Sequence, residues 1–151
     1  MVTDAPFNPM FLLLLIPVIL VGFVLIWSGV VYLLAWLSGW VRLARLYRVT
    51  HRPSGPPMSP WVAMLGPVSY RGALTIQTAP EGLYLSMIVF FRIGHPPLLI
   101  PWSAIKRQGV DQGLLIKWLA LVLGEPTLAI LRLPAAMVDE AVLARYGVKS
   151  Q

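Results

Sequence analysis

The residue types that most often carry chemistry are few in this chain and lie far apart. The 151 residues include two histidines and no cysteine, which excludes thiol catalysis, thiolate zinc sites and iron–sulfur clusters. His51 lies in a Pro-rich segment beside Arg52, and His95 lies in the short motif GHPP. Neither has a partner at the spacing of a metal site. We therefore predict two ordinary loop histidines and no metal or cofactor.

The carboxylates are equally isolated. Glu81 and Glu125 lie at predicted turns, Asp111 lies in a Gly-containing loop, and Asp139 and Glu140 are neighbours on a predicted helix. Two adjacent acids on a solvated helix face are a surface feature far more often than a catalytic pair. The sequence also lacks a glycine-rich phosphate loop that ends in Lys-Ser or Lys-Thr. We therefore predict no catalytic residues and no enzymatic activity.

Basic residues outnumber acidic ones by 12 to 6, which gives a net charge of +6. Four of them, Arg42, Arg45, Arg48 and Arg52, directly follow a long apolar segment. The others are scattered without the basic–aromatic runs of a nucleic-acid interface, so nucleic acid is not an expected partner. The pair Lys106 and Arg107 is the candidate for a further lipid or partner contact.

The apolar segment determines the architecture. Residues 10–41 contain no charge over 32 positions, whereas about 20 apolar residues cross a bilayer. We predict one transmembrane helix within residues 10–48, whose basic end continues into the membrane interface. Residues 1–9 carry no basic side chain, and the arginines follow the helix, so the N-terminus should face out and the remainder should be cytoplasmic. The expected location is the cell inner membrane, in a single pass.

The end of this helix is patterned. Apolar residues recur at helical spacing from Trp36 to Tyr47, and arginines step by three along another face from Arg42 to Arg48. Such an amphipathic segment could lie on anionic headgroups or pack on the following domain, and the sequence leaves both interpretations open. The candidate membrane-interface residues are Trp36, Trp40, Arg42, Arg45, Tyr47, Arg48 and Arg52.

Small residues in the same helix suggest one further contact. Ala35 and Gly39 match the small-x-x-x-small pattern, and Gly22 and Gly29 are seven residues apart. These spacings make a helix-mediated homo-oligomer a hypothesis. They do not distinguish it from chance in a long apolar helix.

Residues 49–60 are predicted to form a Pro-rich linker. After residue 60 the sequence consists of short apolar runs separated by turn residues. We predict a cytoplasmic module over residues 61–147 and a tail at 148–151. Ile100, Trp102 and Ile105 are expected in its core. The fold class is α+β: a small curved antiparallel sheet or partly open barrel, plugged by a C-terminal helix at 134–146. The predicted strands are residues 61–68, 72–78, 83–91, 98–102, 114–123 and 127–133.

Three segments of the module resemble a known family. EGLYLS at residues 81–86 is followed by PLLIPWSAIKR at 97–107, and a later strand runs through LRLPAAMVDEAV at 131–142. This succession resembles bacterial membrane-anchored pleckstrin-homology-like (PH-like) domains. The resemblance covers roughly residues 69–146, and it implies a PH-like module held at a membrane. Many proteins of this small bacterial type have no assigned activity.

Two functions follow as hypotheses. The first is a non-catalytic interaction module at the cytoplasmic membrane face, which binds a protein partner or a lipid surface. The second is a small accessory subunit of a larger membrane complex, bound through its long helix. They differ in whether the module or the helix carries the function.

Overall fold

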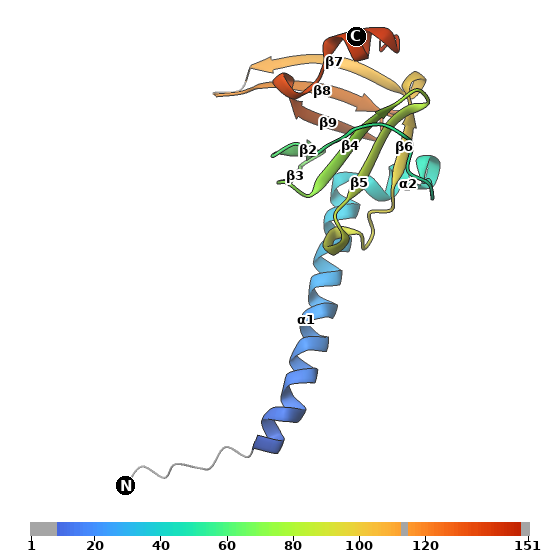
Figure 1. The fold of residues 1–151 in the computed structure, drawn as a ribbon. Coiled ribbons are helices and arrows are strands. Elements are labelled where there is room, and N and C mark those ends of the chain that lie inside the picture. The colour runs from blue at the N-terminus through green and yellow to red at the C-terminus, as the bar shows by residue number, and fades with distance from the viewer. Residues whose placement is uncertain (1–8, 113–114, 149–151) are drawn as a thin grey trace.

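The computed structural model describes residues 9–112 and 115–148. A long apolar N-terminal helix leads into an α+β module of two antiparallel sheets (Figure 1). This confirms the α+β class and the single long apolar helix. The two sheets do not close into a barrel. The predictions for residues 1–8, residue 114 and residues 149–151 lie outside the described residues.

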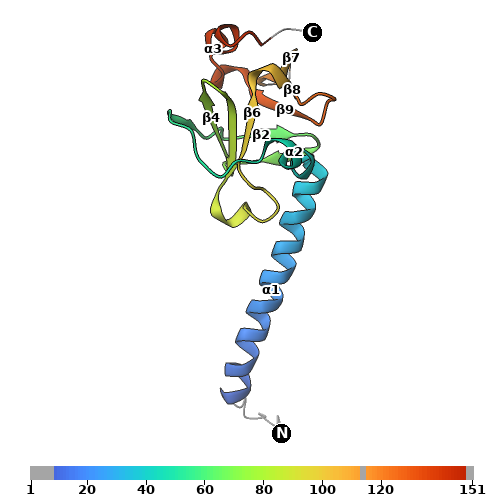
Figure 2. The same cartoon turned by 90° about the vertical axis from the view of Figure 1, so that its right-hand side faces the viewer.

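The predicted continuous helix over residues 10–48 is wrong at one point. Helix α1 spans Pro9–Ser38 and α2 spans Trp40–Tyr47, and between them Gly39 has a φ of +85°. A Cβ at Gly39 would lie 3.0 Å from the carbonyl oxygen of Leu128. Glycine therefore allows both the left-handed turn and the close approach to the module. The chain changes direction here, and α2 packs beside the module (Figure 2).

The first sheet has the strand order β1-β4-β5-β6. Its edge strand β1 lies inside the predicted linker and pairs with β4, so the end of that segment belongs to the module. Proline suits this place because an edge strand can lack a backbone donor. The four strands are β1 (Pro57–Met58), β4 (Leu74–Ala79), β5 (Gly82–Met87) and β6 (Leu98–Pro101).

The second sheet has the order β3-β2-β9-β8-β7. The predicted strand at 61–68 is instead a hairpin, because Gly66 (φ +55°) and Pro67 form a turn. The predicted Gly-containing loop around Asp111 is also wrong there, since Asp111 lies in β7 and Gly109 in a bulge of the same strand. The five strands are β2 (Ala63–Leu65), β3 (Val68–Tyr70), β7 (Ile105–Gln112), β8 (Lys117–Leu123) and β9 (Ala129–Pro134).

The C-terminal helix is shorter than the predicted 134–146. Pro134 still pairs with β8 as the last residue of β9, and a 3₁₀ turn follows at Ala135–Met137. Helix α3 then spans Glu140–Arg145, and the Asp139 carboxylate accepts a hydrogen bond from its first turn. In Figures 1 and 2, α3 lies at the end of the module farthest from α1.

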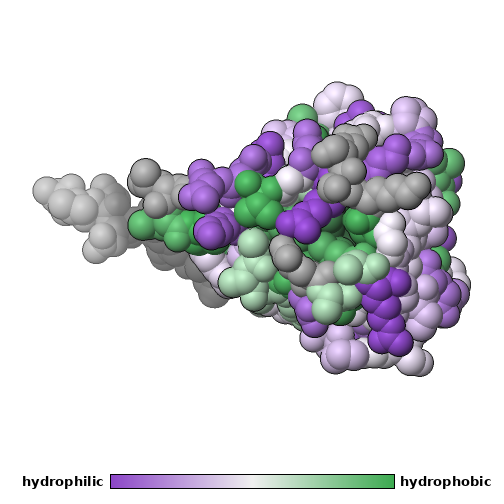
Figure 3. Space-filling model, turned by 90° about the horizontal axis from the view of Figure 1, so that it is seen from above, coloured by the Kyte–Doolittle hydropathy of each residue, from purple (hydrophilic) through white to green (hydrophobic). Residues whose placement is uncertain are grey.

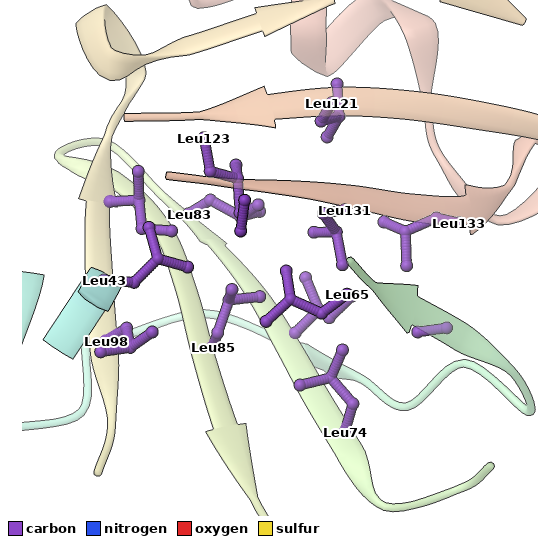
Figure 4. Close-up of a cluster of buried hydrophobic side chains, with 14 of the residues drawn as sticks. Leu43, Leu65, Leu74, Leu83, Leu85, Leu98, Leu121, Leu123, Leu131 and Leu133 are labelled. Carbon is purple, nitrogen blue, oxygen red and sulfur yellow. The ribbon is translucent and has the colours of Figure 1, made fainter. Parts of the chain in front are cut away.

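Leucines from both sheets and from α2 fill the core (Figure 4). Leu43 of α2 is fully buried among them, so the second helix is part of the module's core. The predicted core residues Ile100, Trp102 and Ile105 are confirmed as buried. The labelled leucines in Figure 4 are Leu43, Leu65, Leu74, Leu83, Leu85, Leu98, Leu121, Leu123, Leu131 and Leu133.

Candidate functional site

The lower part of α1 stands clear of the module (Figure 1). Its stretch Leu13–Ser38 is the one described helical segment that is long and apolar enough to cross a membrane. The large apolar side chains described between residues 10 and 26 are all exposed. An exposed apolar surface of this extent marks a site of contact with a membrane or with another apolar surface.

A loop of the module reaches down along α1. This β5–β6 loop, residues 88–97, begins with a 3₁₀ turn at Val89–Phe91. The Trp27 indole Nε1 donates to the Phe90 carbonyl oxygen at 3.2 Å, and the Trp27 and Phe91 rings meet edge to face at 5.5 Å. Phe90 is nevertheless 75% exposed and Val89 69%. The loop thus attaches to α1 while it directs apolar side chains outward.

Sequence reasoning missed this loop because it extended the preceding strand to residue 91. The signal was available: residues 87–91 read MIVFF, five apolar residues without alternation. Such a run does not fit a strand with one solvated face. The apolar run ends before Arg92, and the motif GHPP begins two residues later at Gly94.

The upper part of α1 is held by a close backbone contact. Val31 and Ala35 are fully buried, and a Cβ on Gly94 (φ +73°) would lie 3.1 Å from the Ala35 methyl group. Ala35 and Gly39, the predicted pair for helix association, therefore face the module of the same chain. A Cβ on Gly22 or Gly29 would meet no neighbouring atom within 4 Å, so that part of the homo-oligomer hypothesis stays a prediction.

A buried aromatic cluster of Trp40, Tyr70 and His95 lies where α2, β3 and the β5–β6 loop meet. His95 is fully buried between Trp40 of α2 and Tyr70 of β3, with its ring centroid 5.0 Å from that of Trp40. The Trp40 indole Nε1 donates to the Pro96 carbonyl oxygen at 2.9 Å. The structure places His95 in the loop between two strands, as predicted, and in addition buries it, which the sequence analysis did not predict. The residues that bury His95 lie outside the GHPP motif: Tyr70 is 25 positions away in the chain and Trp40 is 55 positions away.

The hydrogen bonds of His95 are satisfied by a neutral ring. With the proton on Nδ1, the ring donates to the Ile93 carbonyl oxygen at 3.1 Å and accepts the Tyr70 hydroxyl at Nε2, at 2.9 Å. Burial lowers the pKa of His95 below 6.5, against the smaller opposing effect of backbone hydrogen bonds. Burial likewise raises the pKa of Tyr70 to about 12. The cluster thus connects α2, β3 and the loop without a charge.

The predicted interface residues divide between two environments. Trp40 is fully buried and Tyr47 is half-buried, so this part of the apolar stripe packs on the module, whereas Trp36 is 62% exposed. The arginines of α2 and its C-terminal end, Arg42, Arg45 and Arg48, are exposed. Packing on the module is therefore established for the centre of the stripe, and contact with headgroups stays open for the arginines.

The remaining predicted basic residues have partners within the chain. The Arg52 Nε donates to the Gln77 side chain at 3.0 Å. Lys106 and Arg107 lie on β7 of the second sheet, where Lys106 forms an ion pair with Glu125. That pair lowers the pKa of Glu125 through its hydrogen bond and charge.

A second apolar region lies at the opposite end of the module. Between the sheets and α3 there is a pocket of about 230 Å³, lined by side chains that include Leu83, Leu121 and Val142. Figure 3 looks onto this end and shows apolar side chains among hydrophilic ones. The indole of Trp102 stacks on Tyr146 with ring centroids 4.6 Å apart. The chain itself covers much of this region.

Among residues 9–112 and 115–148, no group of three or more His, Asp or Glu side chains is placed to hold a metal ion. Comparisons of the chain with protein-family models, with curated proteins and with solved structures find no match.

Proposed function

We propose that the protein is a non-catalytic, membrane-anchored interaction module that presents a PH-like domain at the cytoplasmic face of the inner membrane. The observation that carries this proposal is the exposure of all the large apolar side chains described between residues 10 and 26, which the module leaves uncovered. A helix of this composition, exposed on all sides, suits a bilayer. The contacts of α1 and α2 with the module hold the domain close to the membrane.

The orientation follows from charge. Positively charged flanks stay on the cytoplasmic side, and the arginines from Arg42 to Arg52 follow the span. Fusions of alkaline phosphatase and of green fluorescent protein to the C-terminus test this in a bacterial host. A fluorescent and phosphatase-inactive C-terminus, retained in membranes after carbonate extraction, is the expected result. An active phosphatase, or extraction by carbonate, contradicts the proposal.

The PH-like assignment of the module is part of the proposal. Two antiparallel sheets of four and five strands enclose the core, and a C-terminal helix covers one end. This arrangement agrees with the resemblance of residues 69–146. The expected ligands are anionic headgroups near the basic residues and a protein partner. An experimental structure in which the strands do not pair in the orders β1-β4-β5-β6 and β3-β2-β9-β8-β7 would contradict the assignment.

A second candidate function is an accessory subunit of a larger membrane complex. It is favoured by Leu33, Trp36 and Leu37, which follow Trp27 on α1 and are exposed. Affinity purification in mild detergent distinguishes the two functions. Partners lost by a Leu33→Ser/Trp36→Ser/Leu37→Ser variant support the accessory subunit, and partners retained by it support the interaction module.

A further inference from the structure

The β5–β6 loop carries an apolar surface that continues that of α1. Ile88 and Ile93 are exposed alongside Val89 and Phe90. A hollow between the loop and α1 is lined by Phe23, Val24, Trp27, Val89, Phe90 and Ile93, with Ser28 as its polar member. The loop and the helix therefore form one apolar surface from two distant parts of the chain.

Backbone groups at the start of the loop have hydrogen-bond partners within the chain. The Ile88 carbonyl oxygen accepts from the Phe91 amide, the Val89 carbonyl oxygen from the Arg92 amide, and the Phe90 carbonyl oxygen from the Trp27 indole. The Ile88 amide donates to the Ala73 carbonyl oxygen at 3.1 Å. An unsatisfied backbone group costs several kcal/mol in hydrocarbon, so a loop with internal partners tolerates an apolar environment better than an open one.

The length of α1 places a membrane boundary at the same level. Helix α1 begins at Pro9, and Trp27 follows 18 residues later without a polar residue between them. Eighteen residues of helix rise about 27 Å. That length matches a hydrocarbon core of about 30 Å. If instead the whole of α1, Pro9–Ser38, lay in the hydrocarbon, the core would have to be about 45 Å thick, well above the usual value of about 30 Å.

Arg92 limits the depth. Its side chain is exposed directly beside the apolar tip. A guanidinium group in the centre of a bilayer is costly, but near the interface it reaches the headgroups while its aliphatic part stays among apolar groups. A loop at the level of Trp27 meets this condition, and a loop deep in the hydrocarbon does not.

We propose that residues 88–93 insert into the cytoplasmic leaflet beside Trp27, as a second membrane contact of the same chain. The occupant of this surface is lipid, and the boundary of the hydrocarbon passes through Trp27 and Phe90. The inference rests on the proposed function, since it requires α1 to span the membrane. It implies that the module lies directly on the bilayer, fixed at two points.

The absence of cysteine allows a direct test in the full-length protein. Phe90→Cys probes the loop, Ile19→Cys probes the middle of α1, and Ser103→Cys probes an exposed site of the module. Each variant carries an environment-sensitive fluorophore and is reconstituted into phosphatidylcholine–phosphatidylglycerol vesicles. Lipids with a nitroxide near the headgroup or near the chain end then quench the label according to its depth.

The expected result is a graded one. The label at position 90 should lose most of its emission with the shallow nitroxide, the label at 19 with the deep nitroxide, and the label at 103 with neither. Val89→Cys serves as a second loop probe if the Phe90 variant unfolds at a lower temperature than the unsubstituted protein.

The other outcomes separate the two proposals. If position 19 is quenched and positions 89 and 90 are not, the loop inference fails and the membrane anchor stands. If position 19 is not quenched, the proposed function itself fails. If the loop is quenched most by the deep nitroxide, the boundary at Trp27 is wrong.

Discussion

The two ends of the β module treat apolar side chains in opposite ways. At the end farthest from α1, Trp102 stacks on Tyr146 at the end of α3, and both Trp102 and Leu143 of α3 are at most 8% exposed. At the end nearest α1, Val89 and Phe90 are more than two-thirds exposed, although the loop itself is anchored by Trp27. The distal end is covered by the chain itself, whereas the proximal end leaves its apolar side chains exposed.

The difference between the two ends separates the apolar groups that stabilise the fold from those that determine where the folded protein is located. Apolar groups that the chain buries contribute to folding, and their removal costs free energy of unfolding. Apolar groups left exposed contribute to folding very little, but they decide which environment the folded molecule occupies. Substitutions at the two ends should therefore have different consequences.

The largest effect is expected at the distal end, from Trp102→Ala. The Trp102 indole is buried, donates to the Ala79 carbonyl oxygen at 2.9 Å and stacks on Tyr146. Its truncation should lower the free energy of unfolding by about 3–5 kcal/mol, measured by chemical unfolding in mild detergent. Trp61→Ala is the control, because Trp61 is 59% exposed. Equal losses in the two variants would remove the distinction between covered and uncovered apolar groups.

A smaller effect is expected where the proximal loop meets α1, from Gly94→Ala. The new methyl group would strain a left-handed residue by about 1–2 kcal/mol and press on Tyr32 and Ala35, at about 1–3 kcal/mol for overpacking. The loop should loosen, and trypsin should cleave faster after Arg92. Gly72→Ala is a matched control, since Gly72 has a φ of +64° and no neighbour within 4 Å. Equal cleavage in both variants would show that the close approach does not hold the loop.

Acid should weaken the proximal end through His95. The folded protein lowers the pKa of His95, so its neutral ring contributes stability above pH 6.5, the ordinary value. Below that pH the unfolded chain binds a proton more readily, and stability falls until the pH reaches the folded-state pKa.

The measurement is the free energy of unfolding between pH 7 and pH 5.5. His95→Gln should flatten the loss in this range, and His51→Gln is the control at an exposed histidine. A slope that persists in His95→Gln would assign the pH dependence to other groups.

The smallest effect on stability is expected from Arg42→Gln/Arg45→Gln/Arg48→Gln. These side chains are exposed, and each basic charge near an anionic surface contributes about 1 kcal/mol to membrane attraction. The protein should stay in the membrane, unfold as before and show a fraction of inverted molecules by phosphatase fusion. Unchanged topology, with the same crosslinking of residues 50–60 to anionic and neutral lipids, would make the arginines an ordinary solvated face.

The sequence alone was sufficient where the signal is local. A run of 32 uncharged residues is far longer than a membrane-spanning strand, so it predicts a long apolar helix, which α1 confirms. Alternation in residues 72–78 predicts β4, and the position of Trp102 after an apolar strand predicts its burial. Each of these conclusions depends on a periodicity that neighbouring residues determine among themselves.

Tertiary structure decided the features that depend on distant contacts. At Gly39, where α1 ends, the backbone lies against Leu128 of the module. A glycine within an apolar run does not by itself predict such a contact. His95 is buried only because Trp40 and Tyr70 meet it from other elements. The β5–β6 loop likewise lies beside Trp27, 63 residues earlier in the chain than Phe90. Packing brings these residues together to bury apolar surface, and no local pattern encodes the choice of partner.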